Sequence, residues 1–126
     1  MRSLPFYTDD LHGGFMKLEG ILRVEGEFLY FEFQKKDAVL EAYQSDLKTL
    51  EIPIASIELA EFKKGFITGK LILHAKRAAV FQDLPGKDLT KRVLKVKRID
   101  RNLAASISSN LNLKLSERKL KELDES

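Results

Sequence analysis

The sequence contains no cysteine and no tryptophan in 126 residues. Without cysteine it has no disulfide framework, no thiolate nucleophile and no zinc site of the cysteine type. Long apolar runs are also missing: the longest, at residues 28–31 and 78–81, comprise four residues each, whereas a membrane-spanning helix needs about 20. The first residues include Pro5, Asp9 and Asp10 instead of the apolar core of a signal peptide. We therefore expect a complete, cytoplasmic protein.

Apolar residues make up 44% of the chain and charged residues 33%, a composition typical of one globular domain, here over residues 1–126. Charge is unevenly distributed along the sequence. Residues 1–62 hold 6 basic and 12 acidic residues, and residues 63–126 hold 16 basic and 7 acidic ones. Such a division indicates either two faces with different partners, or acidic and basic strands that lie side by side in the fold.

Apolar and polar residues alternate through most of the chain, which predicts half-buried strands. Residues 1–12 are polar and are interpreted as an N-terminal lead-in to the fold. Strands are predicted at about residues 15–24, 28–34, 50–54, 57–62, 71–76 and 92–97. Glu25-Gly26 joins the first two strands in a hairpin, with Leu29, Phe31 and Phe33 facing inward. Residues 35–48 form either two strand extensions around a second hairpin, which we favour, or a short helix.

Three further features mark strand ends and turns. Gly20 predicts a bend or bulge inside its strand. Pro53 cannot donate a ladder hydrogen bond, so its strand lies at an edge or ends there. Residues 63–65 and 83–87 carry the glycine and proline signals of turns.

The apolar period changes once, close to Arg98. Beyond it an amphipathic helix is predicted, because the apolar residues fall four apart, and Asp100 is its expected N-cap. Its apolar stripe comprises Ile99, Leu103, Ala104, Ile107 and Leu111. Residues 116–126 are a tail, a short second helix or a continuation of the first. The predicted fold is mainly β: a small, partly open barrel of about seven antiparallel strands, capped by one C-terminal α-helix, with barrel and helix together spanning residues 12–115.

Several segments carry a family resemblance. They are the hairpin at residues 18–31, the segment Glu51-Ile52-Pro53-Ile54-Ala55-Ser56-Ile57, the turn Lys63-Lys64-Gly65 and the strand-to-helix passage at residues 94–111. In this order they resemble the pleckstrin-homology-like superfamily, including its GRAM-type and bacterial members. The resemblance covers about residues 13–115. It implies a PH-like binding or scaffolding module that recognises phospholipids, peptides or protein surfaces, or that assembles with itself.

The chain departs from that family in two respects. Typical members carry a tryptophan in the C-terminal helix, and this chain has none. Members that bind phosphoinositides carry clustered basic residues in the first hairpin. Here Lys17 and Arg23 are followed by Glu25 and Glu27, which would repel a phosphorylated headgroup and argue against the usual inositol-phosphate site.

The best candidate for a binding site is a basic cluster around the last strand and the start of the helix. Lys91, Lys95 and Lys97 alternate on the outer face of that strand, Arg98 and Arg101 flank the start of the helix, and Lys63 and Lys64 join if their turn lies nearby. Cations at a helix N-terminus are mildly unfavourable unless an anion or acidic partner offsets them. The cluster is therefore either an anion- or partner-binding face, or a solvated face paired with the acidic first half.

Nothing in the sequence predicts catalysis. His12 and His74 have no serine or aspartate at a spacing that suggests a triad, and no metal-ligand spacing occurs, so both are interpreted as surface residues. Lys64-Gly65-Phe66 resembles the start of an RNA-stacking strand, but residues 67–70 supply no further aromatic ring. We therefore expect no enzyme, no cofactor, no metal and no nucleic-acid partner.

A separate candidate concerns self-association. Phe28 and Tyr30 point away from the inward face of their strand, so they form an apolar contact patch unless the N-terminal segment or the C-terminal tail covers them. The expected function is a non-catalytic interaction or scaffold module that binds a protein partner or itself. The alternative is a peripheral membrane-binding domain that recognises anionic lipid through the basic strand–helix face.

Overall fold

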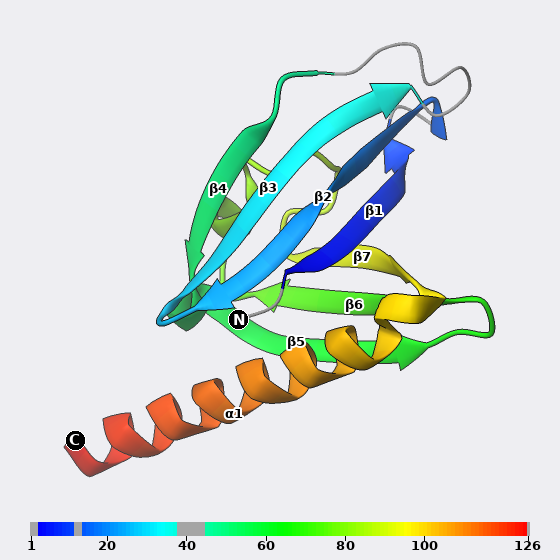
Figure 1. The fold of residues 1–126 in the computed structure, drawn as a ribbon. Coiled ribbons are helices and arrows are strands. Elements are labelled where there is room, and N and C mark those ends of the chain that lie inside the picture. Colours follow the sequence, from blue (N-terminus) through cyan, green and yellow to red (C-terminus); the bar gives the residue numbers. More distant parts are fainter. Residues whose placement is uncertain (1–2, 12–13, 38–44, 126) are drawn as a thin grey trace.

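The computed structural model describes residues 3–11, 14–37 and 45–125. Within them the chain forms one antiparallel sheet of seven strands and one long C-terminal helix, α1 (Arg101–Glu125) (Figure 1). The strands are β1 (Leu4–Leu11), β2 (Met16–Glu25), β3 (Phe28–Asp37), β4 (Lys48–Pro53), β5 (Ile57–Lys64), β6 (Thr68–Ala75) and β7 (Lys91–Lys97). Three short 3-10 turns connect some of them: η2 (Ile54–Ser56), η3 (Ala78–Phe81) and η4 (Arg98–Asp100). The mainly β fold with a single C-terminal helix is therefore confirmed.

The sheet is open, and its strand order is β4-β3-β2-β1-β7-β6-β5. It has two halves that meet at β1 and β7, where Tyr7 and Lys95 are the only pair in register among the described residues. By contrast, β2 and β3 pair at ten consecutive positions. The weak central seam lets the two halves incline steeply toward each other, and the space between them holds the core (Figure 1).

Residues from both halves fill this core. Phe6 and Phe31 contact edge to face with their ring centroids 6.0 Å apart. The expected inward residues Leu29, Phe31 and Phe33 are buried. Phe81, from the long connection between β6 and β7, is also fully buried. Burial of a side chain of this size contributes about 1.5–3 kcal/mol, so the β6–β7 connection is part of the folded unit.

The helix α1 lies along β5 and closes the open side of the bent sheet (Figure 1). Its buried face comprises Ala104, Ile107, Ser108, Leu111 and Leu115. Asn112 fixes the helix to the sheet edge, because its Oδ1 accepts from the backbone N–H of Ala60 (3.0 Å) and its Nδ2 donates to the Ala60 carbonyl (2.8 Å). An edge strand leaves such backbone groups unpaired, and here a side chain satisfies them.

Two glycines show why the first hairpin has its shape. Gly26 adopts φ of 56° in the turn between β2 and β3, a left-handed conformation that favours glycine. At Gly20 a Cβ would lie 2.1 Å from the carbonyl oxygen of Glu32, so only glycine permits β2 and β3 to approach this closely. The predicted bend at Gly20 does not interrupt the pairing, since the β2–β3 register runs through it unchanged.

The expectations for both ends of the chain need correction. Residues 1–12 are not simply a lead-in, because β1 occupies the middle of the sheet. Its alternating inward positions are Leu4, Phe6 and the polar Thr8, Pro5 separates the first two, and the register shifts before the buried Leu11, which together make a weak strand signal. At the other end, α1 continues as one element to Glu125, so residues 116–125 are neither a tail nor a second helix, and the alternative that they continue the first helix is confirmed.

The remaining expectations concern strand ends and turns. Pro53 is the last residue of the edge strand β4, as its missing N–H predicts. The turn at residues 83–87 belongs to the connection that includes η3. β3 and β4 extend to Asp37 and from Lys48, which lengthens both strands as expected. The choice between hairpin and helix for the segment between them, and the position of His12, lie outside the described residues.

Candidate functional site: a basic tip with exposed apolar residues

The turn between β5 and β6 carries two exposed apolar side chains. The backbone N–H of Gly65 donates to the carbonyl of Thr68 (2.8 Å) and closes the turn. Phe66 and Ile67 lie between these residues, with 94% and 70% of their surfaces exposed. Phe66 is the most exposed of the large apolar residues that the structure describes. Water contact over a whole phenyl ring is unfavourable, so this turn is the first feature that needs an explanation.

A third exposed apolar residue lies at the start of the helix. Ile99 is 88% exposed and sits in η4, between β7 and α1. Its predicted place in the buried stripe of the helix was wrong. Residues 98–100 form a 3-10 turn with about three residues per turn, so Ile99 does not continue the face that buries Ala104 and Ile107. Asp100, the expected N-cap, is the last residue of the same 3-10 turn.

A hydrogen bond links the turn to the helix. Nη1 of Arg101, the first residue of α1, donates to the carbonyl oxygen of Gly65 (2.7 Å). The aliphatic part of Arg101 also packs near Gly69, where a Cβ would lie 3.1 Å from its Cγ. A hollow of about 530 Å³ lies between the two segments, lined by Phe62, Lys64, Arg98, Ile99, Arg101 and Asn102.

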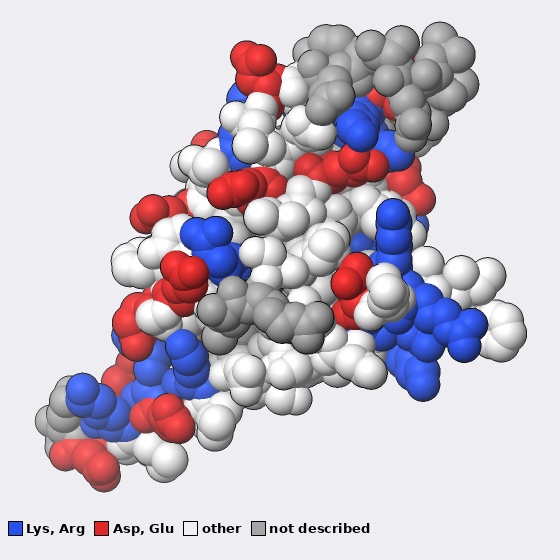
Figure 2. Space-filling view, viewed as in Figure 1, with Lys and Arg blue, Asp and Glu red and all other residues white. Residues whose placement is uncertain are grey.

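Six cationic residues lie on the strand ends and the 3-10 turn next to these apolar side chains. Lys63 and Lys64 end β5, and Lys70 of β6 pairs with Lys63. Lys97 ends β7 and pairs with Thr68, Arg98 begins η4, and Arg101 follows it. Figure 2 shows Lys and Arg side chains gathered at the end of the molecule where α1 begins, beside projecting side chains that carry no charge. We call Phe66, Ile67, Ile99 and these six cations the basic tip. The acidic residue of η4 is Asp100.

The structure brings together five of the seven predicted basic residues: Lys63, Lys64, Lys97, Arg98 and Arg101. Lys91 lies at the opposite end of β7, opposite His74 of β6. Lys95 lies in the middle of that strand and forms an ion pair with Asp9 of β1 (2.7 Å). Of the predicted basic residues only Lys91 is far from the tip, because a strand rises about 3.3 Å per residue, which places it about 20 Å from Lys97. Lys95 lies opposite Lys70 at the border of the tip, where Asp9 engages its charge.

The apolar members of the tip, and Lys70, are what the sequence reasoning missed. Phe66 was considered only as a base-stacking residue. The signal that could have identified it is two bulky apolar residues next to a glycine at a hairpin turn, flanked by lysines on both sides. Turn positions are normally polar, so this pattern is informative without any structure.

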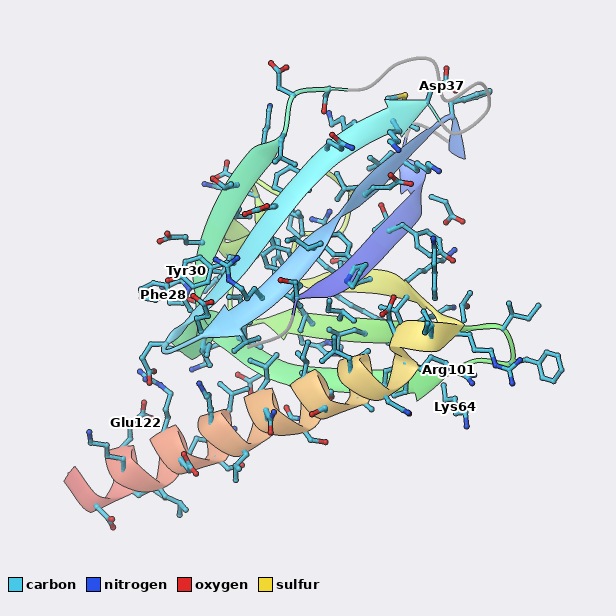
Figure 3. The ribbon with its side chains drawn as sticks, in the orientation of Figure 1. Phe28, Tyr30, Asp37, Lys64, Arg101 and Glu122 are labelled. Carbon is cyan, nitrogen blue, oxygen red and sulfur yellow. The ribbon has the colours of Figure 1, made fainter. Side chains whose placement is uncertain are left out.

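Phe28 and Tyr30 lie at the other end of the molecule from Lys64 and Arg101 (Figure 3). Their ring centroids are 6.2 Å apart, and the Arg23 guanidinium lies 5.3 Å from the Tyr30 centroid. Phe28 is exposed and Tyr30 is half-buried. The pair is therefore a small apolar spot with a cation over one ring, and it is not continuous with the tip.

A second, larger hollow of about 570 Å³ crosses the outer face of β1, β2 and β3. Its charged lining is mixed, with Glu19, Glu32 and Asp100 beside Lys97. Oxygens of Glu19 contact Nζ of Lys17 (3.0 Å) and Nζ of Lys36 (2.9 Å). The hydrogen bond from Lys36 has the largest effect and lowers the pKa of this carboxyl. Burial opposes it with a smaller effect, and the hydrogen bond from Lys17 lowers the pKa further. The acidic lining makes this hollow unsuitable for an anion.

His74 and Glu61 form a further titratable pair, on β6 and β5. His74 was expected to point to solvent, but its Nε2 lies 2.5 Å from Oε1 of Glu61 and its side chain is largely covered. In the described ranges, no three histidine, aspartate or glutamate side chains converge as a metal would require. Over the same residues, α1 is too polar to cross a lipid bilayer.

Comparisons with known proteins add no identification. The chain matches no family model, and no curated protein or solved structure is significantly similar to it.

Proposed function

We propose that this chain is a non-catalytic interaction module of PH-like type that binds the surface of anionic membranes through the basic tip. Of the two functions expected from the sequence, the exposed residues favour the membrane over a protein partner. The observation that carries the proposal is the combination of a 94% exposed Phe66 and an 88% exposed Ile99 with six cations on the adjoining strand ends and turn. The protein then acts as a peripheral membrane component on the cytoplasmic side.

The apolar part of the tip supports insertion into the lipid interface. Phe66 and Ile67 lie in a turn, and Ile99 lies in the neighbouring 3-10 turn, and we expect one lipid surface to contact all three. Burial of one such side chain contributes about 1.5–3 kcal/mol. Aromatic and aliphatic residues with basic neighbours are the composition that interfacial binding requires.

The basic part supports a preference for anionic lipid. A lysine or arginine close to an anionic surface contributes about 1 kcal/mol, and the effect falls off within a Debye length. The tip holds six such residues within two adjoining segments and their neighbouring strand ends. The hollow lined by Lys64, Arg98 and Arg101 offers donors to a single lipid phosphate.

The PH-like classification rests on separate support. A bent, open antiparallel sheet of seven strands with one C-terminal helix across its open side is the architecture that the sequence resemblance implies. Fold alone does not select a ligand, so the tip, and not the fold, carries the functional proposal.

Co-sedimentation with vesicles tests the proposal. The protein should pellet with vesicles of phosphatidylcholine and phosphatidylserine, and should stay in the supernatant with phosphatidylcholine alone. The Lys64→Glu/Arg98→Glu variant should lose roughly 30-fold in partitioning, since the two removed cations alone account for about 2 kcal/mol. The matched control is Lys87→Glu/Lys91→Glu, with the same net charge and exposed positions away from the tip. If both variants lose the same amount of vesicle binding, the loss reflects net charge alone, which would contradict binding through the tip.

A further inference from the structure

The second half of α1 carries an apolar row that the domain itself does not cover. Leu113, Leu120 and Leu123 are 59%, 63% and 70% exposed. With 3.6 residues per turn, Leu113 and Leu120 lie roughly opposite the face that packs on the sheet, and Leu123 lies to one side of them on the part of the helix beyond the sheet. The row therefore points away from the domain, and a second molecule can approach it without meeting the sheet.

The helix also extends past the strands it packs on. Figure 1 shows the last turns of α1 running out beyond β5, and every residue from 119 to 124 is exposed. Only one side of this part is fixed to the domain: Nζ of Lys114 donates to the carbonyl of Gly26 (2.7 Å), and Arg118 pairs with Glu27 (2.7 Å). The opposite side carries the exposed side chains of Leu113 and Leu120.

The spacing of the row is that of a coiled-coil seam. Leu113 and Leu120 are seven residues apart, and Leu123 follows three later. They therefore occupy the a positions of two consecutive heptads and the d position of the second. The other positions of the same seam are Ser106, Ser109 and Ser116. These small side chains allow the first halves of two α1 helices, which pack on their own sheets, to approach each other without a clash.

We propose that two copies of this chain associate through this seam as a parallel, two-fold symmetric pair of α1 helices. Charge selects the orientation. In the heptad defined by the leucines, Lys119 occupies a g position and Asp124 the following e position. Parallel helices place each g residue next to the e residue five positions later in the partner, so Lys119 of one copy meets Asp124 of the other. Antiparallel helices would pair the e-position acids Glu117 and Asp124 with each other.

The parallel arrangement has a consequence for the tip. Both helices begin at the tip, with Arg101 as their first residue, so a parallel pair presents both tips on the same side. Two tips on one membrane bind with an increased effective concentration. This consequence rests on the membrane function proposed above, whereas the dimer itself does not.

Analytical ultracentrifugation at increasing protein concentration tests the dimer. The chain has a mass of 14.4 kDa, and we expect a shift toward twice that mass, because a seam of two heptads is short and its association concentration-dependent. Leu120→Glu should lower the association constant at least tenfold. Leu59→Glu, at an exposed leucine on β5, should leave it unchanged. A monomer at every concentration, or a dimer that Leu120→Glu does not weaken, would overturn the proposal.

Orientation has its own test. Lys119→Glu and Asp124→Lys should each weaken the dimer several-fold, and the double variant should restore it. Because the chain has no cysteine, Leu123→Cys provides one thiol without background, and oxidation should join two copies through this d position. Restoration without cross-linking, or cross-linking without restoration, would overturn the parallel register. A last measurement separates this proposal from the function of the tip. The monomeric Leu120→Glu variant should bind vesicles more weakly than wild type, and adding Lys64→Glu/Arg98→Glu to it should abolish the remaining binding.

Discussion

Arg101 joins the first turn of α1 to the β5–β6 turn, because its Nη1 donates to the carbonyl oxygen of Gly65 at 2.7 Å. One residue thus belongs to the helix, contributes a cation to the tip and supports the turn that carries Phe66. The three roles concern different atoms: the guanidinium contacts Gly65, the stem packs near Gly69, and the backbone begins the helix. The tip is therefore a supported structure and not a loose loop.

Arg101→Met should loosen the turn while the rest of the sheet is unaffected. Methionine keeps an apolar stem but loses the donors to Gly65. We expect faster amide hydrogen exchange in residues 65–68 than in wild type, and unchanged exchange in β2 and β3, which lie in the other half of the sheet. Unchanged protection in the turn would mean that the hydrogen bond between Gly65 and Thr68 is sufficient on its own.

Phe66→Ser separates membrane binding from folding. The side chain is 94% exposed, so stability should change by no more than about 0.5 kcal/mol. Loss of one inserted aromatic ring should weaken vesicle binding by at least about tenfold. Leu89→Ser, at another exposed apolar residue, is the matched control and should bind like wild type. If Phe66→Ser binds as well as the control, the ring does not enter the membrane.

Asn112→Ala tests how the helix is held to the sheet. The substitution leaves the N–H and the carbonyl of Ala60 without their partner on the edge strand β5. Such a loss costs about 1–3 kcal/mol, so the urea midpoint should fall with little change in slope. Asn110→Ala, at an exposed position of the same helix, should have no comparable effect. Equal stability of the two variants would show that the amide contributes nothing net.

Glu19 makes stability depend on pH in a specific window. Its contacts with Lys36 and Lys17 lower its pKa from the usual 4.5, so the unfolded chain binds a proton more readily there than the folded one. The stabilisation is therefore complete above pH 4.5 and is lost as the pH falls through the lower pKa of the folded state. The difference in unfolding free energy between wild type and Glu19→Gln should shrink in that acidic window. A difference that stays constant down to the lowest pH at which both fold would contradict the assignment.

Much of the fold was predictable because period-two burial is a local property. Leu18, Leu22 and Val24 are buried as their alternation predicts, and so are Leu71 and Leu73. The strand β1 was missed since its inward positions are few and one, Thr8, is polar. Its place in the centre of the sheet follows from long-range pairing with β7, which no local pattern contains.

The site was predictable in part for a similar reason. Basic residues near Arg98 are close in sequence, and the turn at Lys64 joined them as expected once β5, β6 and β7 paired. The same pairing places Lys95 opposite Lys70, where it forms an ion pair with Asp9 of β1. The exposure of Ile99 depended on whether the helix began before or after it, and boundaries of this kind vary by one or two residues.

Tryptophan fluorescence tests the central claim most directly. The chain contains no tryptophan, so a Phe66→Trp variant reports on the tip alone. Addition of vesicles that contain phosphatidylserine should shift its emission to the blue, and brominated lipid should quench it, with both effects reduced at high salt. An unshifted, unquenched emission under conditions where the protein sediments with the same vesicles would show that another surface binds the membrane, and would contradict the account of the basic tip.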